Sequence, residues 1–416
     1  MRNKFLGKFF EKTPGKFLRE IKKGFWKKTQ NNKIAGFGNR HFPVPETDET
    51  CREGNKKPFL FSLKKKHAAD GLSYAAGERQ MTTIRENLEK WEEKYLSPYA
   101  TLSKNSLGRL KDEEPCDIRP VFQRDRDRIL HCKAFRRLKD KTQVFLAPEG
   151  DHYRTRLTHT LEVSQNARTI AKALRLNEDL VEAIALGHDL GHTPFGHAGE
   201  RALNRVCPYG FEHSEQSVRT VDVLEKDGQG LNLTFEVRDG IRNHQTKGNP
   251  ATLEGRIVRL SDKIAYIHHD CDDAIRAGIL KEEDIPKDIQ ETAGKTTGER
   301  LDHFIHDIVT NSFGKNEICM SPPVEEAMKK LRAFLFTNVY TNPYAKGEEG
   351  KAELLIETLY DYYLHHLEKL SPELITLMER GEPRERVVCD YIGAMTDRFA
   401  IAQYEEIYIP KCWPNK

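Results

Sequence analysis

Hydrophobic residues after position 81 recur mostly at intervals of three and four, which is the spacing of one face of an α-helix. No stretch shows the sustained alternation of apolar and polar residues, bounded by turns, that is typical of strands. We therefore expect a mostly α-helical fold, and the sequence shows no internal repeat. The predicted helices cover Ile84–Tyr95, Val121–Leu138, Leu157–Leu174, 178–187, Glu215–Leu224, Thr234–Asn243, Leu253–Ala277, and the regions near 324–335, 352–369 and 385–407.

Local signals support the boundaries of the predicted helix over 178–187. Asn177 is a favourable N-cap, and the acidic residues Glu178 and Asp179 suit the positive end of the helix dipole. Gly191 and Pro194 follow the helix and prevent it from continuing. The pattern therefore places a sharp turn directly after this helix.

The composition excludes several classes of protein. No run reaches the roughly 18–20 consecutive apolar residues that a membrane-spanning helix requires, so we expect no integral membrane protein. The 8 cysteines are scattered and form no CxxC pair, which disfavours a zinc knuckle or a redox motif. In a chain of 416 residues they indicate reduced thiols and a cytoplasmic protein.

The basic charge is concentrated at the N-terminus. Residues 1–80 contain 19 Lys and Arg against 8 Asp and Glu, whereas residues 81–416 contain 48 against 56. Aromatic residues alternate with lysines there, as in a basic amphipathic segment that binds an anionic membrane surface or nucleic acid. Pro14 and Gly15 interrupt the helical pattern, which favours a poorly ordered extension. A later start of the native product, at Met81, is a further alternative that N-terminal sequencing decides.

Histidines and aspartates on or beside apolar helices are the candidate metal ligands. His159 lies within one predicted helix, the His188-Asp189 pair ends the next, and Asp262 lies within a third. Burying such groups is costly unless a partner compensates them. One divalent cation held by two imidazoles and two carboxylates compensates all four, and this ligand set suits Mn, Fe, Co, Ni or Zn, and Mg less naturally.

The residues after the His-Asp pair strengthen this interpretation. A single helical histidine is most often a satisfied core or surface residue. The run from His188 to Glu200, however, packs three histidines and two carboxylates into 13 residues, which is costly in a solvent loop and natural in a binding site.

The order His…His-Asp…Asp resembles the signature of the HD-domain phosphohydrolases, and the wider context is similar to the bacterial dGTPase-like deoxynucleoside-triphosphate triphosphohydrolases. The resemblance covers about four-fifths of the chain, from about Met81 onward, and implies an HD-domain helical bundle with a helical C-terminal extension. The matching stretches are Phe135–Phe145, Tyr153–Val163, His188–Glu200, Gly210–Ser217, Arg259–Tyr266 and Asp390–Ala400.

The resemblance also implies roles for individual residues. His159, His188, Asp189 and Asp262 would bind one divalent metal. His197, nine positions after the HD histidine, would be the catalytic histidine, with Glu200 as its carboxylate partner. The residues that would contact the substrate are Gln143, Arg156, His192, Lys263, Tyr266 and Asp270. Independently of the resemblance, Asp262, Tyr266 and Asp270 recur at four-residue intervals and so line one stripe of a helix.

The expected reaction is metal-dependent hydrolysis of a dGTP-like deoxynucleoside triphosphate at the α-phosphorus, giving a deoxynucleoside and inorganic triphosphate. Two alternatives remain: another HD nucleotide phosphohydrolase, such as a phosphodiesterase or 5′-nucleotidase, and a non-catalytic nucleic-acid-binding module. Product analysis distinguishes the first alternative from triphosphate release. Salt-dependent DNA binding without hydrolysis would favour the second alternative.

The expected organisation has three parts. Residues 1–80 form the basic extension, residues 81–320 the HD phosphohydrolase domain with its core at about 153–280, and residues 321–416 the helical C-terminal extension. The resemblance implies a homo-oligomer, and single-stranded DNA or a regulatory nucleotide are further candidate partners. Family members differ in preferred base, native metal and activator, so the resemblance implies none of these.

Overall fold

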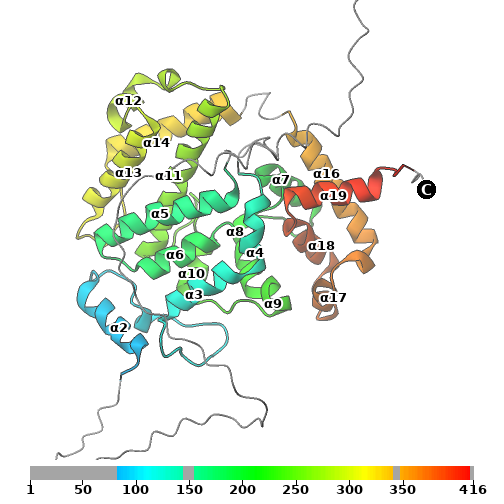
Figure 1. Ribbon diagram of the computed structural model, residues 1–416, viewed down its shortest axis with the longest axis horizontal. Coiled ribbons are helices and arrows are strands. Elements are labelled where there is room, and N and C mark those ends of the chain that lie inside the picture. Colours follow the sequence, from blue (N-terminus) through cyan, green and yellow to red (C-terminus); the bar gives the residue numbers. More distant parts are fainter. Residues whose placement is uncertain (1–81, 144–153, 341–346, 413–416) are drawn as a thin grey trace, which may run out of the picture. The chain divides into compact units, whose positions relative to one another are not determined.

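The computed structural model of the chain describes residues 82–143, 154–340 and 347–412. These parts contain helices, no β-strand, and two isolated bridges, Arg109 to Thr234 and Thr142 to Thr155 (Figure 1). The expectation of a mostly α-helical fold is confirmed. The basic segment 1–80 lies outside the described residues, as do parts of two stretches that carry the family resemblance.

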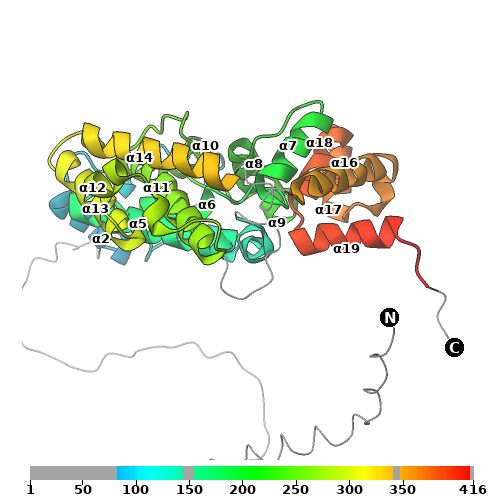
Figure 2. The same cartoon turned by 90° about the horizontal axis from the view of Figure 1, so that it is seen from above.

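A bundle of helices surrounds α6 (Glu178–Gly187) and forms the first part of the core. α5 (Arg156–Leu174) and α3 (Val121–His131) both pack on α6, and α11 (Leu253–Arg276) crosses α5 and α6, while α10 (Phe235–Arg242) lies beside them (Figures 1 and 2). Ile170, Ile184 and Ile257 are fully buried where these helices meet. Burial of each such side chain contributes roughly 1.5–3 kcal/mol, so this packing stabilises the arrangement of the three helices that position the candidate ligands, α5, α6 and α11.

Two glycines allow the turn after α6 to lie close to its neighbours. A Cβ on Gly187 would lie 2.5 Å from the Ile241 side chain on α10. A Cβ on Gly191 would lie 2.2 Å from the backbone nitrogen of Ser217 on α8 (His213–Arg219). Any larger residue would push the turn outward, so both glycines help to fix the position of His188 and Asp189.

The C-terminal helices form a second core cluster with α7 (Gly196–Val206). α16 (Glu349–His365) packs along α7 and also contacts α18 (Arg384–Gly393) and α19 (Asp397–Tyr408). Phe195, Leu203 and Ile356 are buried in this cluster. The chain segment from His188 to Glu200 therefore runs from one core cluster into the other.

Three predicted helices are interrupted, and in one case a distant carboxylate starts the second helix. Val121–Leu138 is divided at Cys132, because the Glu225 carboxylate accepts hydrogen bonds from the backbone of Lys133 (3.0 Å) and Ala134 (2.7 Å) and so starts α4 (Lys133–Arg137). The region 385–407 is divided between α18 and α19, where Asp397 accepts from the backbone of Phe195 at 3.0 Å. The Glu215–Leu224 segment ends its α-helix at Arg219 and continues as one π turn.

The remaining helices complete the fold. The predicted helix near 352–369 ends at His365, and a short 3-10 turn follows. Among the described residues, five helices were absent from the sequence prediction, namely α7, the single turn α9 (Glu225–Gly228), α12 (Lys287–Ala293), α13 (Thr297–Ser312) and α17 (Pro372–Glu379). The others are α2 (Ile84–Tyr95) and α14 (Pro322–Leu335), which were predicted. Among the described helices, none combines the length and the apolarity that crossing a bilayer would require.

A buried ion pair on α3 gives a stability prediction. Asp125 is fully buried, pairs with Arg109, and accepts hydrogen bonds from the backbone nitrogen (2.8 Å) and hydroxyl (2.7 Å) of Thr234. Asp125→Ala removes the buried anion of Arg109, which keeps only its pair with the more exposed Glu113 at 2.9 Å, and leaves the Thr234 donors without their acceptor. We therefore expect the free energy of unfolding to fall by about 3–5 kcal/mol. Urea denaturation measures this, with Asp127→Ala, which breaks a more exposed pair with Arg119, as the control. Equal effects of the two variants would contradict the prediction.

Candidate metal centre and active site

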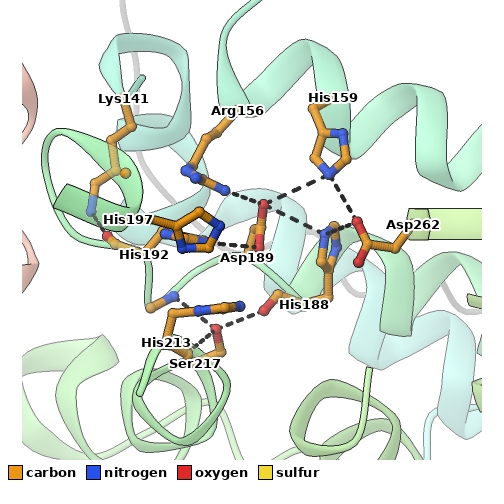
Figure 3. A network of polar contacts seen from close by, with 12 residues as sticks. Lys141, Arg156, His159, His188, Asp189, His192, His197, His213, Ser217 and Asp262 are labelled. Carbon is orange, nitrogen blue, oxygen red and sulfur yellow. Dashed lines mark hydrogen bonds and ion pairs between the residues drawn. The ribbon is translucent and has the colours of Figure 1, made fainter. Parts of the chain in front are cut away.

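Four ligand atoms from two helices and one turn converge in the bundle. His159 lies in the second turn of α5, His188 and Asp189 follow α6 directly, and Asp262 lies in the middle of α11. The His159 Nε2 atom is 3.1 Å from Asp262 Oδ1 and 3.9 Å from Asp189 Oδ2. The His188 Nε2 atom is 3.5 Å from Asp189 Oδ2 and 3.7 Å from Asp262 Oδ1 (Figure 3). The structure thus brings together all four residues that the sequence indicated as ligands.

The orientation of His188 fits a metal ligand. Its Nδ1 atom lies 2.7 Å from the Ala185 carbonyl oxygen, which can only accept, so Nδ1 carries the proton and Nε2 the lone pair. The Nε2 atom is buried and has no hydrogen-bond partner among the described residues. A buried lone pair without a partner is costly, and a cation between these imidazoles and carboxylates removes that cost. The donor set therefore fits a divalent metal.

The two carboxylates stay ionised, Asp189 in a buried position and Asp262 in a partly buried one. Burial by itself would raise the pKa of Asp262, but the hydrogen bond from His159 and the nearby imidazole of His188 hold that pKa at about 2. Burial likewise opposes ionisation of Asp189, and the nearby His188 and Arg156 keep its pKa well below the usual range. Two anionic groups therefore face each other in a site that needs positive charge.

A further histidine, His269, contacts the His159 ring on the side away from Asp262. The Nδ1 atom of His269 lies 3.3 Å from the Nδ1 atom of His159, and the other nitrogen of His269 contacts the carboxylate of Glu162. His269 is only 1% exposed. His269 is therefore not a surface histidine of α11. Glu162 and His269 instead form a chain that sets the orientation of the His159 ring.

This chain gives a prediction about metal affinity. Partners behind a ligating histidine typically contribute 10–100-fold to metal affinity. We expect Glu162→Gln to weaken metal binding about 10-fold, at the low end of that range because Glu162 acts through His269. Equilibrium dialysis against Mn²⁺ measures the affinity. Glu182→Gln, at an ion pair with Arg126, is the control, and equal affinities of the two variants would contradict this role.

His197 and Glu200 lie beside the cluster, on the first turns of α7. The His197 side chain is 68% exposed, and its Nδ1 atom is 2.9 Å from Glu200 Oε2. Glu200 also accepts from the backbone nitrogen (2.8 Å) and Nδ1 atom (2.9 Å) of His213. Burial by itself would raise the pKa of Glu200, but the hydrogen bonds from His197 and His213 lower this pKa well below its usual range. An ionised Glu200 therefore orients two imidazoles.

Arg156 and His192 both touch Asp189. The Arg156 guanidinium donates to Asp189 Oδ2 at 2.7 Å, while its buried Nε–H has no partner among the described atoms. The His192 Nε2 atom lies 3.6 Å from Asp189 Oδ1, and its ring stacks on His213 with centroids 4.0 Å apart. The Lys141 ammonium donates to the His192 carbonyl oxygen and so holds this turn in place (Figure 3).

The other predicted substrate contacts lie outside this polar network. Tyr266 and Asp270 continue the stripe of Asp262 along α11, and burial raises the pKa of both groups. The Lys263 ammonium lies near Arg259 and Arg332, and burial lowers its pKa. The buried side-chain oxygen of Gln143 has no partner in the described parts of the chain. No hydrogen bond or ion pair between described residues joins these four side chains to the His-Asp cluster.

His213 and His244 also lie at the site, although the sequence pattern indicated no role for either. His213 belongs to the Gly210–Ser217 stretch that carries the family resemblance, so a signal for it was present. His244 directly follows the predicted helix Thr234–Asn243, just as His188 follows the helix before it. Its Nδ1 atom lies 2.7 Å from the Ile241 carbonyl oxygen, the same contact that His188 makes with Ala185.

Comparison with known proteins identifies the family. The HD domain family matches residues 156–267, and the phosphohydrolase-associated domain matches residues 318–406. A deoxyguanosinetriphosphate triphosphohydrolase-like protein of Caldanaerobacter subterraneus is 59% identical over 330 residues, which cover 79% of this chain and 97% of the relative. Proteins of the same description from Desulfatibacillum aliphaticivorans and Clostridium perfringens are each 50% identical, over 79% of this chain and 99% and 98% of their own lengths. The chain therefore belongs to the HD-domain family of deoxyguanosinetriphosphate triphosphohydrolase-like proteins.

Proposed function

We propose that this protein hydrolyses dGTP-like deoxynucleoside triphosphates at the α-phosphorus and releases a deoxynucleoside and inorganic triphosphate. The observation that carries the proposal is the convergence of two imidazoles and two ionised carboxylates around the unpartnered Nε2 atom of His188. Membership of the triphosphohydrolase-like family, at 59% identity to one relative, supports this substrate class.

His159, His188, Asp189 and Asp262 would hold one divalent cation, for which Mn, Fe, Co, Ni, Zn and Mg are candidates. When bound there, the cation supplies Lewis-acid polarisation of a phosphate oxygen. Asp189 has a second task, because its carboxylate holds the Arg156 guanidinium at 2.7 Å. The metal ligand therefore also positions the cationic side chain that would meet the triphosphate.

Arg156 and Lys263 would offset the negative charge of the triphosphate. The fork of the Arg156 guanidinium matches phosphate oxygens, and its buried Nε–H is not used by another described residue. Tyr266 and Asp270, farther along α11, and Gln143, at the end of a described segment, would contact the sugar or the base. The spacing along α11 then sets the distance between the metal and the sugar.

His197 is the group best suited to move a proton. Its ring is largely exposed, and Glu200 accepts from Nδ1, so Nε2 is free to exchange a proton with water or with the departing nucleoside oxygen. His192, stacked on His213 and close to Asp189, would face the phosphates.

The domain organisation and the oligomeric state are part of the same proposal. Residues 81–320 would form the catalytic domain and residues 321–416 an extension that closes over the site or joins protomers. We also propose that the protein acts in the cytoplasm as a homo-oligomer, where single-stranded DNA or a nucleotide could regulate it.

Product analysis tests the proposed reaction. The purified full chain is incubated with each dNTP, alone and in mixtures, with Mg²⁺, Mn²⁺ or Co²⁺, and the products are separated by ion-exchange chromatography. We expect inorganic triphosphate and deoxynucleoside in equal amounts. Release of pyrophosphate or orthophosphate without triphosphate would contradict the proposal and favour another HD phosphohydrolase.

A further inference from the structure

The turn before His197 has an unusual backbone conformation. Phe195 has a φ of 61° and a ψ of 24°, in the left-handed region that residues with a Cβ atom rarely adopt, and Gly196 follows with a φ of 56°. His197 is the next residue, on the first turn of α7. Strained conformations of this kind persist only where surrounding contacts hold them, and they cluster at active sites. The direction of the His197 side chain therefore depends on the contacts that hold Phe195 and Gly196.

Asp397, from the C-terminal helices, makes one of these contacts. It is the first residue of α19 and is buried. Its Oδ1 atom accepts a hydrogen bond from the backbone nitrogen of Phe195 at 3.0 Å. Its Oδ2 atom accepts from the backbone nitrogen of Thr142 at 3.0 Å and from the Thr142 hydroxyl. One carboxylate thus joins the turn before α7 to a segment that lies more than fifty residues earlier in the chain.

Thr142 connects this turn to the proposed triphosphate-binding side chain. It forms an antiparallel bridge with Thr155, which directly precedes Arg156. A Cβ on Gly196 would lie 3.4 Å from the Arg156 guanidinium and 3.6 Å from the Thr142 carbonyl oxygen. The turn before His197 therefore rests against both Thr142 and Arg156. Holding this turn fixes the imidazole of His197 relative to the guanidinium.

Lys141 provides a second link of the same kind. Its ammonium is buried and donates to the His192 carbonyl oxygen and, at 2.8 Å, to the carbonyl oxygen of Gly393 at the end of α18 (Figure 3). Lys141 holds the turn at His192, and Asp397 holds it at Phe195. The C-terminal helices therefore brace the turn at two points.

We propose that Asp397 is a positioning residue, which fixes the turn before α7 and so aims His197 at the phosphate group that Arg156 would bind. This inference rests on the proposed function, because that function assigns the proton transfer to His197. Asp397 lies in the stretch Asp390–Ala400, which carries part of the family resemblance but contains none of the proposed site residues. No hydrogen bond or ion pair between described residues joins Asp397 to a proposed metal ligand. Its effect on the reaction would therefore pass through His197.

Asp397→Asn tests this role in a double-mutant cycle with His197→Gln. The amide keeps the shape of the side chain, but its nitrogen would face a backbone N–H that now lacks an acceptor. We expect kcat to fall about 10²-fold, as small misplacements of a reacting group can cost, while metal content stays unchanged. In the His197→Gln background the same substitution should lower kcat by less than about 3-fold, because the group that it positions is already absent. The measurement is kcat at saturating dNTP, together with metal analysis.

The matched control is Glu92→Gln. Glu92 is also a buried helical carboxylate that accepts from the backbone nitrogen and hydroxyl of one residue, Ser103, both at 2.7 Å. It lies on α2, at the opposite end of the helical part of the chain from α19 (Figures 1 and 2). We expect Glu92→Gln to lose stability in urea but to keep normal kcat. A similar loss of kcat in both variants would tie activity to stability alone and overturn the proposal.

Two further measurements keep the test decisive. If Asp397→Asn does not fold, Thr142→Val removes only the hydroxyl contact, and it should lower kcat about 5-fold with His197 present and leave kcat unchanged without it. In protein with isotope-labelled histidine, the NMR resonance of the His197 ring is identified by its loss in His197→Gln. That resonance should shift in Asp397→Asn, or in Thr142→Val, and stay in place in Glu92→Gln.

The outcomes distinguish this inference from the proposed function. Full kcat in Asp397→Asn, or an equal fall with and without His197, would overturn the positioning role, and triphosphate release by the unsubstituted chain would still support the proposed function. If the unsubstituted chain releases no triphosphate, the proposed function fails. The His197 resonance then decides the role of Asp397, because an unchanged resonance in Asp397→Asn would show that this carboxylate does not hold the imidazole.

Discussion

Asp189→Asn is expected to abolish triphosphohydrolase activity, with kcat/KM falling by about 10⁴-fold or more, which corresponds to about 5.5 kcal/mol of transition-state stabilisation. The Asp189 Oδ2 atom lies 3.5 Å from His188 Nε2 and 3.9 Å from His159 Nε2, and the carboxylate also holds Arg156 at 2.7 Å. The amide keeps the size of the side chain but loses its negative charge. The cation would then lose a ligand, and Arg156 would lose the anion that positions it.

The same variant should lose most of its bound metal. Activity with each dNTP and metal content after dialysis are measured together, because loss of activity with full metal content would assign Asp189 to positioning Arg156 alone. Asp222→Asn is the control, since Asp222 is partly buried and pairs with Arg238 at 2.6 Å outside the His-Asp cluster. Near-normal activity in Asp189→Asn would exclude this site as the catalytic centre.

His197→Gln is expected to separate metal binding from catalysis. His197 lies beside the proposed ligands and is not one of them, and Glu200 remains held by His213 when the ring is removed. A general acid or base typically contributes 10²–10⁴-fold, so we expect kcat to fall by about 10²–10⁴-fold while metal content stays unchanged. The measurement is kcat at saturating substrate together with metal analysis.

A matched control for His197 is His306→Gln, because His306 is also exposed and also lies near a carboxylate of its own helix, Asp302. That variant should have normal kcat. If His197→Gln kept full activity, the proton would have to be moved by another group of the site. If it lost its metal, His197 would be a ligand rather than a catalytic residue.

The helical class and the four converging side chains could be predicted from the sequence because both follow from local patterns. Apolar spacing predicted α5, α6 and α11, and the candidate ligands occur on or beside those helices. Burial of His188 next to Asp189 also follows, since the turn comes directly after an apolar helix. The geometry of that turn depends on Gly187 and Gly191, whose small size permits contacts with Ile241 and Ser217.

The features that the sequence did not predict depend on contacts between distant residues. Cys132 breaks a continuous apolar pattern because Glu225, far along the chain, accepts from the start of α4. The role of His269 could not be predicted, because only the packing of α11 on α5 places it against His159. His213 and His244 meet Asp189 only after α8 and α10 fold against the turn.

Hydrolysis in water enriched in heavy oxygen tests the central claim most directly. Attack by water at the α-phosphorus places the new oxygen on the released triphosphate and leaves the deoxynucleoside unlabelled. We predict label in triphosphate alone, in a reaction that a chelator stops and added Mn²⁺ restores. Label in the deoxynucleoside, or phosphate release that persists after complete removal of metal, would contradict the account.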